Sequence, residues 1–173
     1  MDIQFVAQLD ATADVIIFPV RKAEIGQVGG AQAELLAATA GQSRFEAAAG
    51  TLVEASVLED GKLRRVALLG LGEASEHDLE RAGAAITARY QTSGVAKLGV
   101  DFTASADVAE QQILSVALGA KLRNWRLDTY RTKLSEQAKP SLKTIVIASA
   151  HGLSSPISVS FNFVMSQASR ARE

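Results

Sequence analysis

The alternation of short apolar runs with longer amphipathic stretches is the feature that most constrains how this chain folds. Runs of four to seven β-branched and aliphatic residues suit buried strands, whereas apolar residues spaced three and four apart suit helices that lie on a sheet. The two patterns take turns from one end of the chain to the other. Such alternation is typical of a layered α/β domain.

The strand predictions come from two kinds of pattern. Alternating apolar residues predict a strand over Ile3–Leu9, and a continuous apolar run predicts a buried strand over Val15–Phe18, ended by Pro19. The Asp-Gly pair at 60–61 predicts a turn that folds the strand Thr51–Val57 back on the next. The remaining strands are predicted over Val66–Leu69, Leu98–Phe102 and Leu142–Ala148.

The helix predictions rest on apolar periodicity and on capping residues. An Ala- and Leu-rich helix over Ala31–Ala40 is expected to stop at Gly41, and a helix through Leu79–Tyr90 is expected to start near Ser75 or Glu76. Two further helices are predicted over 113–122 and 157–173, the last one capped by Ser155-Pro156. The last pattern has no stop signal at Glu173, which favours a piece of a longer protein. The charged segment 123–140 is predicted to be a long ordered loop.

Composition excludes several classes of site. A chain of 173 residues with 47% hydrophobic content suits one domain with a buried core. The absence of cysteine excludes disulfides, zinc–thiolate and iron–sulfur sites and a cysteine nucleophile, and only His77 and His151 could offer an imidazole. A net charge of -1 gives no electrostatic case for nucleic acid or an anionic membrane. No targeting or membrane-spanning segment is recognised, so we expect a soluble protein of the cytoplasm.

The glycine pair in Gly70-Leu-Gly-Glu73 lies between a predicted strand and a predicted helix, where backbone amides can cradle a phosphate. The third glycine of a dinucleotide fingerprint is missing, because Ser75 stands there, and no Gly-Lys-Ser/Thr follows. We therefore favour a tight strand-to-helix turn, and ligand binding by this loop stays open.

The other polar candidates favour ordinary structural roles. His77 lies in an acidic helix start with no second histidine nearby, and His151 follows a strand without an identifiable partner. Ser154 and Ser155 lack the glycines of a nucleophile elbow, so capping explains them better. A basic and aromatic group could contact nucleic acid, although an ion-paired loop is favoured; it comprises Arg123, Trp125, Arg126, Tyr130, Arg131 and Lys133. No catalytic, cofactor-binding or metal-binding residue is assigned in this chain.

Three segments in a fixed order carry a resemblance to a known family. The strand and turn Val66-Ala-Leu-Leu-Gly-Leu-Gly-Glu73 and the helix Leu79-Glu-Arg-Ala-Gly-Ala-Ala85 resemble consecutive elements of the N-terminal domain of leucyl aminopeptidases, the cytosol aminopeptidase family. The stretch Ala117–Lys133, with Trp-Arg-Leu-Asp followed by Tyr-Arg, is similar to a third element. The order of these elements along nearly the whole chain carries the resemblance.

The resemblance implies a macro-domain-like, three-layer α/β/α fold with a mixed, mostly parallel sheet. It implies residues 1–150 as a non-catalytic N-terminal domain and 151–173 as a linker helix that leads to a catalytic domain beyond this chain. That domain would hold two divalent metal ions, Zn or Mn, and the parent would be a homo-hexamer that releases N-terminal amino acids from peptides. The alternative is a stand-alone macro-like module that binds ADP-ribose or another nucleotide.

Overall fold

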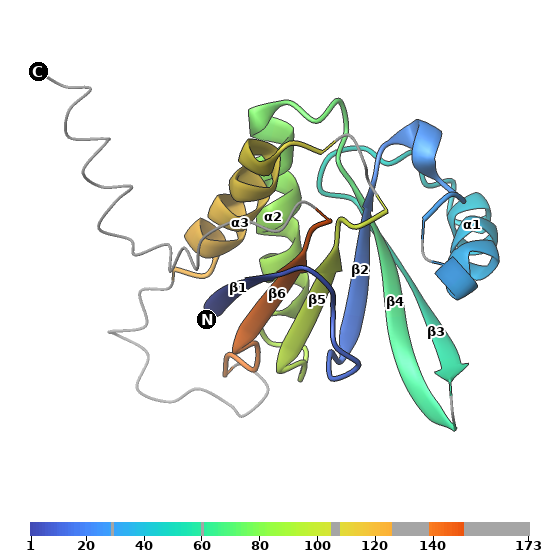
Figure 1. Cartoon of the computed structure of the whole chain (residues 1–173), viewed down its shortest axis with the longest axis horizontal. Helices are drawn as coiled ribbons and strands as arrows, with labels where there is room; N and C mark the ends of the chain where they lie inside the picture. Colours follow the sequence, from blue (N-terminus) through green and yellow to red (C-terminus); the bar gives the residue numbers. More distant parts are fainter. Residues whose placement is uncertain (29, 60, 105–107, 126–138, 151–173) are drawn as a thin grey trace, which may run out of the picture.

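A six-stranded sheet with helices on both faces forms the framework of the molecule (Figure 1). The structure, a computed structural model, describes residues 1–28, 30–59, 61–104, 108–125 and 139–150. The strands lie in the order β1-β6-β5-β2-β4-β3. Their bounds are Asp2–Val6 for β1, Val15–Val20 for β2, Leu52–Glu59 for β3, Lys62–Gly70 for β4, Lys97–Asp101 for β5 and Thr144–Ala148 for β6.

All neighbouring strands are parallel except the last pair. The strands β3 and β4 form an antiparallel hairpin in which Glu59 pairs with Lys62, as the Asp-Gly turn predicts. Gly61 takes a φ of +73° there, a conformation that favours glycine. The sheet is therefore mixed but mostly parallel, and β3 forms one of its two edges.

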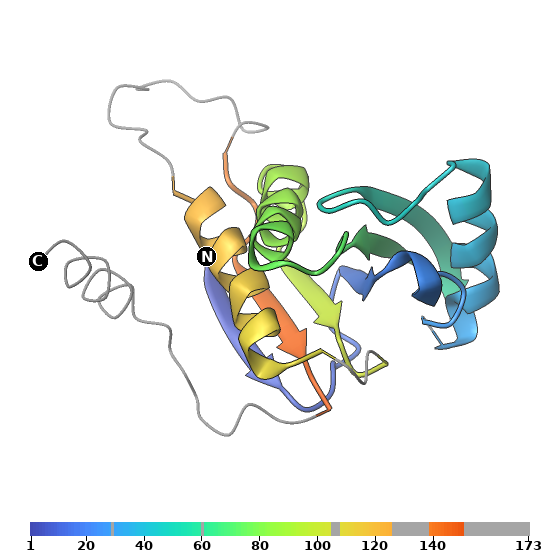
Figure 2. The same ribbon diagram turned by 90° about the horizontal axis from the view of Figure 1, so that it is seen from above.

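The three α-helices of the described residues divide between the two faces of the sheet. Helix α1 (Ala33–Gln42) covers one face near β4 and β3, while α2 (Glu76–Tyr90) and α3 (Glu110–Arg123) lie side by side on the other (Figure 2). Alternate residues of β2 show the division, since Ile17 belongs to the core under α2 and α3 and Phe18 to the core under α1. The predicted three-layer α/β/α architecture is confirmed.

The connection between β1 and β2 crosses the sheet without a helix. Residues 7–14 run over β6 and β5, and a Cβ atom at Gly99 of β5 would lie 2.8 Å from a methyl carbon of Leu9. Glycine at that position leaves room for the Leu9 side chain against the strand. The Asp14 carboxylate then accepts hydrogen bonds of 2.9 Å from the N–H groups of Ala96 and Lys97, which ties the loop to the start of β5. The predicted strand over Ile3–Leu9 accordingly ends at Val6.

Two predicted stop signals are wrong. Pro19 does not end β2, which runs on to Val20. The Val20 carbonyl accepts from the N–H of Leu71, next to β4, so the backbone of Pro19 faces β5 instead. Pairing of β2 with β5 has already stopped at Ile17, so proline is tolerated beyond it. Gly41 does not stop α1 either, because the positive φ that ends the helix, 51°, falls at Arg44 instead.

The other predictions on described residues are confirmed to within a few residues. Ser75 caps α2, since its hydroxyl accepts from the N–H of Asp78 at 3.2 Å. The predicted terminal helix and most of the predicted loop lie outside the described residues. Within the described ranges, no helix is both long and apolar enough to cross a membrane.

Candidate functional site

The glycine loop after β4 is closed by the chain itself. Its backbone N–H groups already donate to acceptors within the domain: Gly70 to Thr51 O, Leu71 to Val20 O, Gly72 to Ala47 O, Glu73 to the Asp78 carboxylate and Ala74 to Leu71 O. A phosphate bound here would have to displace these bonds. The carboxylate of Asp78 takes the place an anion would occupy at the start of α2.

Close packing explains both glycines of this loop. A Cβ atom at Gly70 would lie 2.2 Å from the carbonyl oxygen of Ala48, and Gly72 has a φ of +59°. Neither a backbone clash nor a left-handed conformation suits an L side chain. The interpretation as a tight strand-to-helix turn therefore fits the structure.

The structure describes three of the remaining sequence candidates, His77, Arg123 and Trp125. His77 is exposed in the first turn of α2. No group of three or more His, Cys, Asp or Glu side chains in the described part of the chain could hold a metal ion. Arg123 and Trp125 are exposed at the end of α3, with Trp125 at 69%. The other candidates lie outside the described residues: Arg126, Tyr130, Arg131, Lys133, His151, Ser154 and Ser155.

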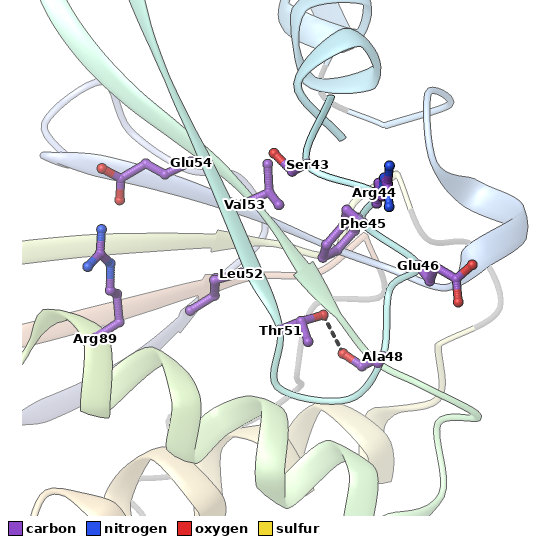
Figure 3. Close-up of a pocket in the computed structure, with 10 residues that line it drawn as sticks. All are labelled: Ser43, Arg44, Phe45, Glu46, Ala48, Thr51, Leu52, Val53, Glu54 and Arg89. Carbon is purple, nitrogen blue, oxygen red and sulfur yellow. Dashed lines mark hydrogen bonds between the residues drawn. The ribbon is translucent and has the colours of Figure 1, made fainter. Parts of the chain in front are cut away.

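An open groove of about 680 Å³ runs along the edge of the sheet at β3 (Figure 3). We call it the edge groove. Residues 51–54 form its base, the segment 43–48 after α1 forms one wall, and Arg89 of α2 stands on the other side. Val53 lies toward the first wall, to which Phe45 belongs, and Leu52 lies toward Arg89. The groove is thus lined by a strand with apolar side chains on both of its faces.

A partly buried polar contact lies at the base of the edge groove. The Tyr90 hydroxyl donates to Glu54 Oε2 at 2.6 Å, and Arg65 Nη1 lies 3.7 Å from Glu54 Oε1. Burial, with the Glu54 carboxylate beside it, raises the pKa of Tyr90 well above its usual value. Tyr90 therefore stays a neutral donor to Glu54, and Arg65 forms an ion pair with the same carboxylate.

A second hollow of about 490 Å³ lies between the crossover loop, β2 and the end of β5. The connections from the two parallel strands diverge there, since β2 leads to α1 on one face of the sheet and β5 leads to α3 on the other. Ligands of α/β sheets often bind at such a point. Its polar groups are used internally: Asp101 accepts from the N–H and the hydroxyl of Thr103, and Arg64 donates to Ala11 O.

Sequence reasoning missed the edge groove. The pattern of Thr51–Val57 does show Glu54 among apolar residues, but its partner Tyr90 is 36 residues away. The only available signal was a charge within a predicted strand.

Comparison with known proteins places these features in a wider context. The model of the cytosol aminopeptidase family, N-terminal domain, matches residues 21–134. A probable cytosol aminopeptidase of Caulobacter vibrioides is 31% identical over 164 residues, 87% of this chain and 32% of the relative. One from Rhizobium johnstonii is 30% identical over 135 residues, 74% of this chain and 27% of the relative. The chain thus spans about a third of the length of these relatives or less.

Solved structures show a similar arrangement. A mutant of tomato leucine aminopeptidase superposes with a TM-score of 0.64 at 17% identity, covering 87% of this chain and 32% of that one, which shows the fold alone. The bottromycin maturation enzyme BotP in complex with Mn gives a TM-score of 0.57 at 25% identity, covering 79% of this chain and 27% of that one.

Proposed function

This chain belongs to the cytosol aminopeptidase family as its N-terminal domain, and we propose that it is a non-catalytic part of a metal-dependent leucyl aminopeptidase. The parent enzyme would release N-terminal amino acids from peptides. The observation that carries the proposal is the family match over residues 21–134.

The chemistry belongs to the part of the protein that this chain does not include. The chain corresponds to 32% of the Caulobacter relative. We place two divalent ions, Zn or Mn, in the remaining catalytic domain, where they would activate water and polarise the scissile carbonyl. No residue of this chain is proposed as a ligand, because its described acidic and histidine residues do not cluster.

The domain's role would be assembly and control of access to the active site. Residues 1–150 would form the domain, and 151–173 would lead into the catalytic domain as a linker helix. The natural partners would be that catalytic domain and further copies in a homo-hexamer in the cytoplasm, without nucleic acid or membrane.

Two measurements test this function. The purified 173-residue chain should not hydrolyse leucine p-nitroanilide in Mn²⁺ or Zn²⁺, and robust metal-dependent hydrolysis would overturn the non-catalytic role. The reading frame of the source gene should continue beyond Glu173 into an acidic metal-binding region. A stop codon directly after Glu173 would rule out the linker.

The alternative of a nucleotide-binding module finds no support in the glycine loop, because its five amides are engaged. Calorimetry with millimolar ADP-ribose should therefore detect no binding. Measurable affinity would bring that alternative back.

A further inference from the structure

The strand β3 is an unusually accessible edge. It is eight residues long, and among the described residues it pairs only with β4. Edge strands are commonly protected by lysine or proline, but Leu52–Glu59 contains neither. The tip of the hairpin adds two exposed leucines that face each other across the strands, Leu58 at 76% and Leu63 at 72%. The molecule thus presents unpaired backbone and exposed apolar surface on one element.

The sequence of β3 is complementary to itself in the antiparallel direction. If two copies pair about Ala55, Val53 of one copy lies opposite Val57 of the other, and Leu52 lies opposite Leu58. In the same register Glu54 lies opposite Ser56, so no like charges lie directly opposite each other. Apolar residues therefore match on both faces of the strand, on either side of this polar pair.

Backbone geometry allows this register. Gly70 N–H donates to Thr51 O, so the odd-numbered residues of β3 direct their backbone groups toward β4 and the even-numbered ones toward the free edge. Pairing about Ala55 sets Glu54 opposite Ser56 and Leu52 opposite Leu58, which are the residues whose backbone groups are free to bond. Ala55 itself then falls at the two-fold axis, in a non-hydrogen-bonded pair.

The edge groove fits the second copy. Residues 56–58 of the partner strand would lie along residues 52–54, which form the base of the groove. Ala55 and Val57 pack with Phe45 toward the α1 core, whereas Leu52 packs toward the α2 and α3 core. The partner strand would therefore place its Val57 beside Phe45 and its Leu58 beside Leu52 (Figure 3).

The charge in the middle of the strand does not oppose this contact. Glu54 accepts from Tyr90 and forms an ion pair of 3.7 Å with Arg65 of its own chain. An arriving strand would therefore meet a carboxylate that already has a hydrogen-bond donor and a cation beside it.

We propose that two copies of this chain associate through antiparallel pairing of their β3 strands about Ala55, which extends the sheet across both molecules and fills the edge groove of each with residues 56–58 of the other. This specifies one contact of the proposed assembly role and rests on it only for its biological purpose. The contact itself is tested with the chain alone, so its failure would leave the proposed aminopeptidase function unaffected.

The lack of cysteine makes a direct test possible. In a non-hydrogen-bonded antiparallel pair the Cα atoms are about 4.5 Å apart, within the range of about 4.4 to 6.8 Å that a disulfide spans. Ala55→Cys should therefore form a covalent dimer on mild oxidation. The matched control, Ser56→Cys, changes the next residue of the same strand but lies opposite Glu54, so it should stay monomeric on a denaturing, non-reducing gel.

Sedimentation of the unmodified chain gives the second readout. We expect a concentration-dependent monomer–dimer equilibrium whose dissociation constant rises by about tenfold or more in Leu58→Lys, which loses two buried leucine contacts per dimer. Leu63→Lys makes the same substitution at a similarly exposed leucine of β4, one strand further inside the sheet, and should raise the dissociation constant less. A chain that stays monomeric at several hundred micromolar, equal linking of both cysteine variants, or linking of Ser56→Cys alone would each overturn the proposal.

Discussion

Replacing Gly83 by alanine should destabilise the domain, although alanine favours helix formation. Gly83 lies within α2 where α3 crosses it, and a Cβ atom there would lie 1.9 Å from the carbonyl oxygen of Val116 and 2.8 Å from the amide nitrogen of Ala120. Both contacts are with backbone, so no side chain can rotate away. The helices would have to separate.

The magnitude follows from three contributions. Overpacking against backbone costs about 1 to 3 kcal/mol. Separation also breaks the buried bond in which the Thr87 hydroxyl donates to Ala120 O at 2.9 Å, one helical turn from Gly83, and an unsatisfied buried group costs about 1 to 3 kcal/mol. Alanine regains about 1 kcal/mol of helix propensity. The net loss should be about 3 kcal/mol in the free energy of unfolding.

Urea unfolding followed by circular dichroism measures this change, and Gly41→Ala is the matched control. Gly41 also lies in a helix, but a Cβ atom there would meet nothing within 4 Å. That variant should be unchanged or stabilised by up to about 1 kcal/mol. If Gly83→Ala were as stable as the unmodified chain, the close approach of α2 and α3 would not limit the side chain as argued.

Three further changes test other contacts. Tyr90→Phe removes the hydrogen bond to Glu54 and should lower the free energy of unfolding by about 1 to 2 kcal/mol in urea unfolding. Hydrogen bonds from Thr12 and then from Lys97 lower the pKa of Asp10 to about 2, below its unfolded value of about 3.9. The stabilisation from this carboxylate is therefore present above about pH 4 and is lost as the pH falls to about 2. Asp10→Asn should make the decline of Tm over that pH range less steep. Gly70→Ala should lower Tm strongly because of the carbonyl 2.2 Å from the new Cβ, and equal thermal stability would contradict the packing described.

Local signals predicted most of the elements but not their arrangement. The hairpin was predictable because an Asp-Gly pair between two apolar runs is typical of a tight turn. Helix α2 was predictable from the helical spacing of its apolar residues and from the capping residue Ser75. The prediction that Pro19 ends β2 was wrong because the effect of a proline depends on which neighbouring strand still pairs at that position. That is a property of strand order, which depends on contacts between distant residues and not on local pattern.

The candidate site shows the same limit. The glycine loop could be interpreted as a turn from the missing third glycine alone. The edge groove could not, because it forms only when the segment after α1, the strand β3 and the end of α2 meet. Nothing within Thr51–Val57 reveals that the strand lies at an edge of the sheet.

The close-packed glycines and the backbone amides of the glycine loop serve contacts within the chain. We therefore look for the function of the domain on its surface and not in a pocket. The glycines that allow close approach admit other parts of the same chain: Gly70 the backbone of residues 47–48, Gly83 that of α3 and Gly99 the crossover loop. The amides that could bind an anion are likewise bonded internally. Among the described residues, these contacts leave the outer edge of β3 unpaired, next to the exposed Leu58. The proposed pairing of β3 follows from this arrangement, because the edge of that strand is available while the backbone amides of the glycine loop are already bonded.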